Sequence, residues 1–356
     1  MRFVSLLAIA FAVITGVTIP AEAHAVPTAS SAHCAAPRAA DTSSIQGWIG
    51  YLASHPDDYA LRVTPIDGAP ISHDSGAVFP AASSVKLIHL AAYASAVADG
   101  RLNPEARVSV NEWQRWYLAL DGGAHARALA YLKIPAVDGI PVDGTRTVTY
   151  EQLADVMIRF SDSAAPDLLR NTLGDNSLRS VMDRFGFSDD VPSLLGAYLA
   201  TIDPTLQRPD DAFRAAQRYH DDPAYAAAIR ARVATGDPEA ARANALLQAT
   251  PNALHSLMTG LADGSFGPGA PLARRVLEYQ GPSSDGSILG FKGGSLPGVI
   301  TEVFEYRTAD GRIGVGTLMV RGLSDADTKA DNFAHQKLLL AAITDPAVAH
   351  ALRCIA

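Results

Sequence analysis

The chain has 356 residues, of which 48% are hydrophobic and 19% are charged, so it is long enough for one large domain or two modest ones. Its formal net charge is -8, and the sequence contains no dense stripe of Lys and Arg. This composition argues against a protein that binds polyanions, because nucleic acid and anionic membranes are bound by clustered positive charge.

The N-terminus has the composition of an export signal. Arg2 precedes an apolar run over residues 4–19, and the small-residue site Ala21-Glu22-Ala23 follows it. This pattern predicts a signal peptide over residues 1–23 with cleavage after Ala23, and a signal anchor is the alternative. No other apolar stretch approaches the length that crosses a bilayer. We therefore expect a secreted or periplasmic protein without a membrane anchor after cleavage.

The sequence contains two cysteines, Cys34 and Cys354, one near each end of the mature chain. Export would place them in a compartment where disulfides persist, so we expect them to pair. The bridge would require both ends of the chain to lie side by side. In the chain-entropy model a loop of this length contributes about 5 kcal/mol as an upper figure. Two free thiols at frayed ends are the alternative.

Sheet elements are predicted near both ends of the mature chain. After a flexible leader over residues 24–41, Thr42 or Ser43 can cap a first helix that runs to Ala53. A final helix is predicted over residues 325–344. The predicted strands cover residues 59–65, 69–73, 287–291, 299–307 and 312–321.

The middle of the chain is predicted to be helical. From residue 79 to about residue 280, the apolar spacing is helical and Gly, Pro and Asp punctuate it. The sequence therefore predicts an α+β fold, in which an antiparallel sheet is flanked by terminal helices and an all-α domain is inserted. The expected units are an α/β subdomain of residues 42–78 and 284–356, and a helical subdomain of residues 79–283. Such an insertion brings the chain ends together, which suits the expected disulfide.

The most informative motif, Ser83-Ser84-Val85-Lys86, lies in FPAASSVKLIHLAAYASAVAD. Residues three apart share a helix face, so the Lys86 amine can lie against the Ser83 hydroxyl. The run over residues 85–97 is apolar on nearly every face and describes a buried helix. A desolvated lysine loses proton affinity and can serve as base for a serine nucleophile, which is the chemistry of covalent acyl transfer. The alternative is that Ser83 caps the helix and Lys86 reaches water.

A second polar element, Ser161-Asp162-Ser163, interrupts the helical segment over residues 147–174. The preceding helix opens with a capping-box pattern at Thr149. Two hydroxyls that bracket a carboxylate can present Ser161 toward a cleft, while Asp162 bonds nearby backbone and fixes the turn. The alternative is a plain linker between two helices.

The third polar element is Phe291-Lys292-Gly293-Gly294-Ser295, at the end of the strand predicted over residues 287–291. Glycines in this position permit a ligand to approach the backbone closely. Lys292 would supply positive charge, and an edge strand with free N–H groups can dock an extended substrate and donate to a developing oxyanion. A Gly/Ser turn is the alternative.

The order S-x-x-K, S-D-x, K-x-G is the arrangement of class A β-lactamases and penicillin-binding proteins, and the chain resembles that superfamily. The likeness spans almost the whole mature sequence. The segments that carry it are FPAASSVKL, TYEQLADVMIRFSDSAAPDLL, QATPNALHSLMTGLADG and LGFKGGSLPGVITEVFEY. The family fold is an antiparallel sheet with terminal helices and an inserted helical domain, which the strand pattern predicts separately.

The resemblance implies a role for each polar element. Ser83 would be the acylated nucleophile with Lys86 as its base, and Ser161 would relay a proton to the leaving group. Lys292 would hold Ser161 electrostatically and attract a substrate carboxylate. The backbone N–H groups of Ser83 and Ser295 would form the oxyanion hole. The resemblance implies no cofactor, and the ten histidines contain no pair at metal-ligand spacing.

The chain departs from the family pattern in both later motifs. Ser163 stands where the family has Asn, so the amide that contacts the substrate's acyl amide is missing. Gly293 replaces the usual Thr or Ser and removes a hydroxyl that binds a β-lactam carboxylate, which Ser295 could partly replace. Substrate choice is therefore open.

The largest departure concerns deacylation, for which class A enzymes use a Glu after the second motif. No Glu occurs between Glu151 and Glu239. Asp189, Asp190 and Asp203 lie in the right region, and Asp203 is the first of them to test. The preferred interpretation is that no carboxylate has this role and that the acyl-enzyme is hydrolysed slowly.

The leading hypothesis is an exported, monomeric serine hydrolase that acts on a β-lactam or a related amide or ester through acyl-Ser83. The first alternative is a DD-peptidase or esterase that β-lactams acylate but that turns them over poorly. The second alternative is a non-catalytic binding protein on the same fold. Intact Ser83, Lys86, Ser161 and Lys292 argue against this last one.

Overall fold

The computed structural model describes residue 34 and residues 40–188, 190–236 and 238–356. The expected signal peptide lies outside the described residues, as does most of the expected leader. Within the described ranges, no helix is both long and apolar enough to cross a membrane.

A five-stranded antiparallel sheet lies at the centre of the fold, with the strand order β2-β1-β11-β10-β9. Its strands are β1 (Tyr59–Thr64), β2 (Ile71–His73), β9 (Ile288–Leu296), β10 (Val299–Arg307) and β11 (Ile313–Val320). Strand β1 pairs with β11, so the two ends of the chain build one sheet. Strand β9 is longer than predicted, and the Lys292-Gly293-Gly294-Ser295 motif lies in its final part.

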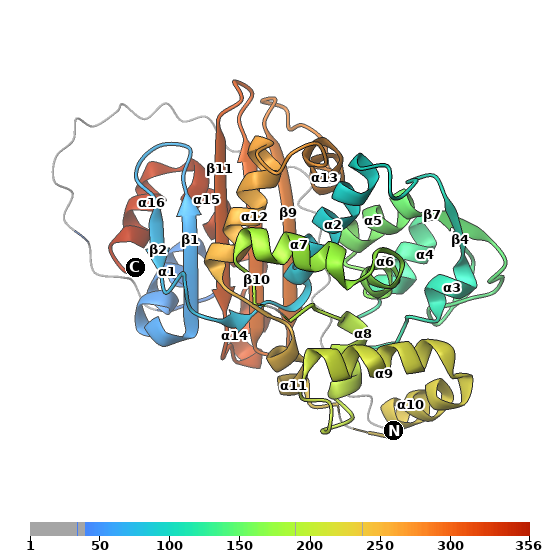
Figure 1. Cartoon of the computed structure of the whole chain (residues 1–356). Helices are drawn as coiled ribbons and strands as arrows, with labels where there is room; N and C mark the ends of the chain where they lie inside the picture. The colour runs from blue at the N-terminus through green and yellow to red at the C-terminus, as the bar shows by residue number, and fades with distance from the viewer. Residues whose placement is uncertain (1–33, 35–39, 189, 237) are drawn as a thin grey trace.

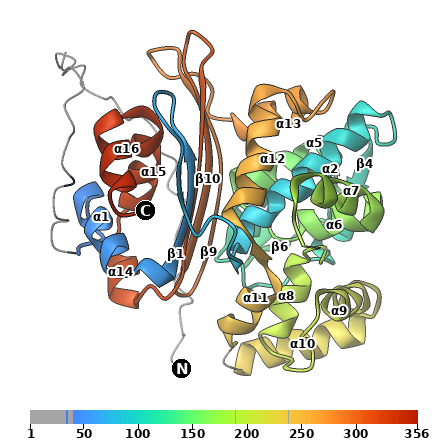
Figure 2. The same ribbon diagram turned by 60° about the vertical axis from the view of Figure 1, so that its left-hand side comes forward.

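Terminal helices cover one face of the sheet (Figure 2). They are α1 (Ile45–Ser54), α14 (Asp325–Ala330), α15 (Ala334–Thr344) and α16 (Pro346–Arg353), and a 3-10 turn over Pro56–Asp58 follows α1. The prediction of one helix over 325–344 is wrong, because Phe333 has a left-handed backbone with φ 61°. The Asp331 carboxylate accepts the N–H groups of Phe333 and His335, both at 3.0 Å, and so starts α15 afresh.

The remaining helices lie on the other face of the sheet (Figure 1). They are α2 (Lys86–Ala98), α3 (Val110–Gln114), α4 (Ala124–Tyr131), α5 (Tyr150–Arg159), α6 (Ala165–Leu173), α7 (Asp175–Phe185), α8 (Leu194–Ala200), α9 (Pro209–Asp221), α10 (Pro223–Thr235), α11 (Ala240–Leu246), α12 (Pro251–Asp263) and α13 (Ala270–Leu277). Three short two-stranded sheets also occur in this largely helical region. They pair β3 (Phe79–Pro80) with β8 (Gln248–Ala249), β4 (Arg107–Ser109) with β7 (Thr147–Thr149), and β5 (Ala136–Val137) with β6 (Ile140–Pro141).

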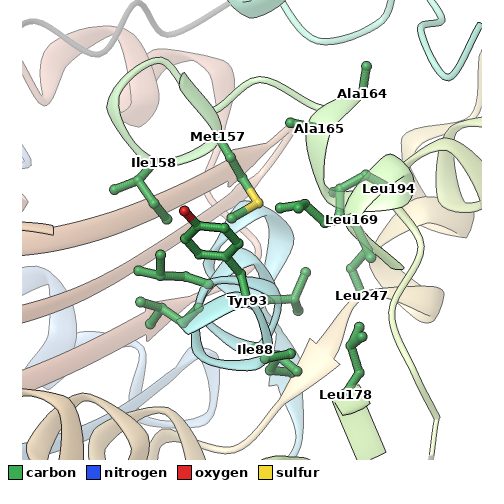
Figure 3. Packing of buried hydrophobic residues seen from close by; sticks show 14 of the residues in the cluster. Ile88, Tyr93, Met157, Ile158, Ala164, Ala165, Leu169, Leu178, Leu194 and Leu247 are labelled. Atoms are coloured by element: carbon green, nitrogen blue, oxygen red, sulfur yellow. The ribbon is translucent and has the colours of Figure 1, made fainter. Parts of the chain in front are cut away.

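The two faces of the sheet bury separate cores, because side chains alternate along a strand. Val303 and Met319 belong to the core on the helical side, whereas Phe304 and Leu318 belong to the core under the terminal helices. Helix α2 runs through the larger core with ten of its thirteen residues buried, as its largely apolar sequence predicts. Figure 3 shows the Tyr93 ring of α2 among neighbouring apolar side chains.

The disulfide between Cys34 and Cys354 is present, with the two Cα atoms 5.5 Å apart. Cys354 directly follows α16, so the bridge fastens the start of the described chain to the terminal helices. The sequence-based expectation of this pairing is confirmed.

We expect the Cys34→Ser/Cys354→Ser variant to unfold at a lower temperature, with a loss of about 2–5 kcal/mol, because the closed loop no longer restricts the unfolded chain. Thermal unfolding with and without a reductant measures the effect. The reductant should destabilise the wild type to the level of the variant and leave the variant unchanged. Equal stability of the two oxidised proteins would contradict a stabilising role.

Candidate active site

Ser83 lies in a 3-10 turn over Ala82–Val85 that leads directly into α2. Ala82 has a left-handed backbone with φ 46°, a strained conformation for a residue with a Cβ. The Ser84 hydroxyl donates to the Ala81 carbonyl at 2.7 Å and holds the turn. Ser83 caps neither this turn nor α2, so its hydroxyl is not used for capping.

Lys86 is the first residue of α2 and is fully buried. Its Nζ lies 3.0 Å from Ser83 Oγ, 3.0 Å from Ser161 Oγ and 3.2 Å from Ser163 Oγ. It also donates to the Ser161 carbonyl at 2.6 Å. The side chain therefore does not reach water, contrary to the alternative interpretation of the motif. Two motifs that lie 75 residues apart meet at this amine.

Burial sets the protonation of this amine. Desolvation lowers the pKa of Lys86 to about 8, although the negative charges of Asp162, Asp121 and Asp167 oppose the shift. Near that pH a large fraction of Lys86 is neutral and carries a lone pair. A neutral amine 3.0 Å from Ser83 Oγ can accept the hydroxyl proton.

Ser161 and Asp162 form the link between α5 and α6. Ser161 has a left-handed backbone with φ 61°. The Asp162 carboxylate is fully buried and accepts the N–H groups of Ala164 at 3.2 Å and Ala165 at 2.7 Å. These bonds hold the turn that presents Ser161 to Lys86, which is the arrangement that the Ser-Asp-Ser pattern predicts.

Two aromatic residues that sequence reasoning did not assign to the site hold Asp162 from the other side. Trp113 Nε1 donates to Asp162 Oδ1 at 3.0 Å, and His125 Nδ1 lies 2.6 Å from Oδ2. His125 Nε2 in turn lies 2.8 Å from Gln114 Oε1. Burial alone would raise the pKa of Asp162, but His125 and the other hydrogen bonds keep that pKa lowered. No spacing in the sequence links these positions to the motif, because the contacts are long-range.

Lys292 of β9 reaches the same hydroxyl from the sheet. Its Nζ lies 3.1 Å from Ser161 Oγ and also donates to the Gly293 carbonyl. The side chain is 1% exposed, and burial together with the charge of Lys86 lowers its pKa well below the usual value. Two lysine amines therefore contact one serine hydroxyl beside Ser83.

Strand β9 passes so close to the Ser83 turn that a side chain cannot fit at Gly294. A Cβ there would lie 2.6 Å from the Ser83 nitrogen and 2.7 Å from the Ala81 carbonyl oxygen. The next residue, Ser295, pairs with Ile300 of β10 and follows directly on this close approach. The glycine therefore brings the backbone of an edge strand against the backbone of the nucleophile candidate.

The segment after the second motif contributes Tyr198 of α8, whose hydroxyl lies 3.1 Å from Ser163 Oγ. Asp203 instead accepts from the N–H of Thr205 at 3.0 Å and its hydroxyl at 2.7 Å, within its own turn. Asp189 lies outside the described residues and Asp190 is exposed. Within the described part of the chain, no carboxylate hydrogen-bonds to Lys86 Nζ.

A single group of potential metal ligands occurs among the described residues. Cys34, His350 and Cys354 bring three donor atoms within 4.8 Å of one another. The disulfide uses both sulfur atoms, so this group does not fit a metal ion.

We expect Lys86→Met to raise the melting temperature at pH 7, by about 5 °C, because a pKa lowered to about 8 corresponds to a cost of roughly 3 kcal/mol for a buried ammonium. The lowered pKa means that the unfolded chain binds more protons between about pH 8 and pH 10.5, so wild-type stability rises with pH in this window. The difference in melting temperature between Lys86→Met and wild type should therefore shrink as the pH rises through this window. Lys337→Met, on the exposed side of α15, is the matched control. A destabilised Lys86→Met at all pH values would contradict the expected cost.

Comparisons with known proteins agree with this architecture. A comparison with curated proteins gives no significant match. Among solved structures, a β-lactamase from Sphaerobacter thermophilus is similar with 18% identity and a TM-score of 0.53, over 84% of this chain and 98% of that one. The ancestral class A β-lactamase of Gram-negative bacteria has 16% identity and a TM-score of 0.51, over 87% and 97%.

A third similar structure is a point mutant of PBP-A as an acyl-enzyme complex with penicillin G, with 17% identity and a TM-score of 0.50 over 83% of this chain and 95% of that one. At these identities the structures support the fold, which is the β-lactamase/transpeptidase-like α+β fold that the sequence predicts. The model of the β-lactamase enzyme family matches residues 43–280, which is more than half of the chain. The chain therefore belongs to the β-lactamase enzyme family.

Proposed function

We propose that this chain is a serine hydrolase that reacts with a β-lactam, or with a related amide or ester, through an acyl-Ser83 intermediate. One observation carries the proposal: the buried Lys86 amine lies 3.0 Å from Ser83 Oγ and has a pKa of about 8. A serine is a weak nucleophile until a neighbouring base takes its proton, and a desolvated lysine is such a base.

Acylation then proceeds in balanced steps. Neutral Lys86 accepts the Ser83 proton as Ser83 Oγ forms a bond to the substrate carbonyl carbon. The C–N or C–O bond of the substrate then breaks, and the leaving atom takes a proton from the Ser161 hydroxyl. Ser161 recovers its proton from Lys86, whose Nζ lies 3.0 Å from Ser161 Oγ. Lys86 ends neutral, as it began.

Positive charge and backbone donors assist this step. Lys292, 3.1 Å from Ser161 Oγ, favours the transient alkoxide character of Ser161 and attracts a substrate carboxylate. The N–H groups of Ser83 and Ser295 bind the oxyanion, and the close approach at Gly294 supports this assignment. Removing one such donor typically costs a factor of about 10²–10³ in rate.

A second candidate function is a DD-peptidase or esterase that β-lactams acylate but that releases the acyl group slowly. The observation that favours it is the hydroxyl of Tyr198, rather than a carboxylate, next to Ser163. Burial raises the pKa of Tyr198, so the phenol is a poor base for activating water. Fast acylation at this site therefore does not imply fast hydrolysis of the acyl-enzyme.

We also propose that the protein is exported. The Cys34–Cys354 disulfide supports this, because disulfides persist in oxidising compartments. The expected signal peptide is consistent with the same proposal.

Exposure of the mature protein to a penicillin and to a cephalosporin should add the mass of the opened β-lactam, because ring opening leaves the acyl group on Ser83. Intact-mass spectrometry detects the adduct while substrate loss is followed in parallel. Fast substrate loss indicates a β-lactamase, and a lasting adduct indicates the second candidate. Ser83→Ala should abolish both signals. If a folded wild type gives neither with β-lactams, esters or D-peptides, the proposed chemistry is wrong.

Gly294→Ala should slow acylation by about 10²-fold or more, because its Cβ would push the Ser83 N–H away from the position that binds the oxyanion. Rates of adduct formation measure the loss. Gly76→Ala is the matched control, since a Cβ there would meet only Asn252 Nδ2 at 4.0 Å. Circular dichroism should show both variants folded. A Gly294→Ala protein with the wild-type rate would remove Ser83 N–H from the proposed oxyanion hole.

A further inference from the structure

Ser163 Oγ is the meeting point of three hydrogen-bonding groups. Lys86 Nζ lies 3.2 Å away, the Tyr198 hydroxyl 3.1 Å away and the Ser161 carbonyl oxygen 3.5 Å away. A serine hydroxyl has one donor and two acceptor sites. The carbonyl can only accept, and when Ser163 donates to it, both lone pairs of Ser163 are left to accept from Lys86 and Tyr198.

Tyr198 is suited to be the donor in this arrangement. Its side chain is 7% exposed, and burial raises the pKa of its hydroxyl. The phenol therefore stays protonated across the working pH range and has a proton to donate to Ser163. In this arrangement every hydrogen-bonding site of the Ser163 hydroxyl is occupied. The orientation of the lone pair that faces Lys86 therefore depends on whether Tyr198 donates to the second lone pair.

Helix α8 holds Tyr198 in place through contacts at its beginning and along one side. The fully buried Asp167 carboxylate accepts the N–H of Leu195 at 2.7 Å. Arg170 donates to the Val191 carbonyl at 3.0 Å just before the helix. A Cβ at Gly196 would lie 2.8 Å from the Ala212 carbonyl carbon of α9, so the two helices are in close contact. The Tyr198 hydroxyl is therefore presented by a fixed element.

The charged groups around Lys86 act on it from a distance, whereas the hydroxyls touch it. Asp162, Asp121 and Asp167 raise its pKa by Coulomb attraction, and Lys292 lies on the other side of Ser161. None of the three carboxylates is among the hydrogen-bond partners of Lys86 Nζ within the described chain. A change in the orientation of one hydroxyl therefore alters the direct solvation of the ammonium form.

We propose that Tyr198 is a positioning residue of this site, which acts through Ser163 to orient an acceptor lone pair toward the ammonium form of Lys86. The inference deepens the proposed function and rests on the role of Lys86 as the base. Without the Tyr198 hydroxyl, Ser163 is free to turn and the ammonium loses a fixed acceptor. Hydrogen bonds to a charged form favour that form, so the proton affinity of Lys86 falls.

The test is a double-mutant cycle on the pH dependence of acylation. Wild type, Tyr198→Phe, Ser163→Ala and the double variant are labelled with a fluorescent penicillin from about pH 6 to about pH 10. The wild-type rate should rise with a midpoint near pH 8. Tyr198→Phe should lower the midpoint by about half a pH unit, and should lower it no further in the Ser163→Ala background. An equal shift in both backgrounds, or no shift in either, overturns the proposal.

Tyr93→Phe is the matched control, because it also removes a buried hydroxyl, one for which the described structure shows no hydrogen bond. It should leave the midpoint unchanged. If Tyr93→Phe shifts the midpoint as much as Tyr198→Phe does, the effect comes from general loosening of the core and the proposal fails.

A second measurement needs no substrate. The pH dependence of the melting temperature is recorded for wild type and Tyr198→Phe, each with Lys86 and with Lys86→Met. In each background, the pH dependence of the difference in melting temperature between the protein with Lys86 and its Lys86→Met variant reports the proton affinity of Lys86. If wild type resists every acylating probe, the proposed function fails, and this linkage alone decides the inference. A lower linkage midpoint in Tyr198→Phe supports it, and identical midpoints overturn it.

Discussion

The removal of the Lys86 amine from water is the physical constraint on which the rest of this structure depends. An ammonium in the core is costly, and here the cost appears as a pKa lowered to about 8. Hydroxyl and carbonyl groups of Ser83, Ser161 and Ser163, rather than a carboxylate, hydrogen-bond to the Lys86 amine and offset the cost of burying it. A paired carboxylate would restore the charge and remove the basicity. In the proposed reaction, the largely apolar α2 thus contributes to the chemistry, because it excludes water from Lys86.

Strain and polar contacts are distributed around that amine in a consistent way. Ala82 and Ser161 both have left-handed backbones, and each belongs to a turn that delivers a hydroxyl to Lys86. Such conformations persist where the surroundings over-determine them. At the Ser161 turn, the Asp162 carboxylate holds the strained backbone in place through hydrogen bonds to the main chain, Trp113 and His125. At the other turn, the backbone of β9 packs so closely that a Cβ at Gly294 would lie 2.6 Å from the Ser83 nitrogen.

Sequence reasoning succeeded where local chemistry decides the structure. The spacing of Ser83 and Lys86 is a helix-face relation, and β10 begins and ends at the predicted residues 299–307, directly before a turn over residues 308–311. It failed where distant residues decide. Tyr198, with no charge and no motif, becomes a site residue only when α8 packs against the second motif.

These features suit the first step of the proposed reaction, acylation of Ser83, better than the second step, hydrolysis of the acyl-enzyme. In the proposed reaction, the groups that acylation needs converge on Ser83: a neutral base, a relay hydroxyl, a second lysine amine and close backbone donors. Release of the acyl group needs a base for water, and the group next to Ser163 is instead a phenol that burial keeps protonated. The Asp203 carboxylate, which the sequence made the first candidate, is bonded within its own turn. In the proposed reaction, the lifetime of the acyl-enzyme therefore depends on whether neutral Lys86, regenerated after acylation, can itself accept a proton from water.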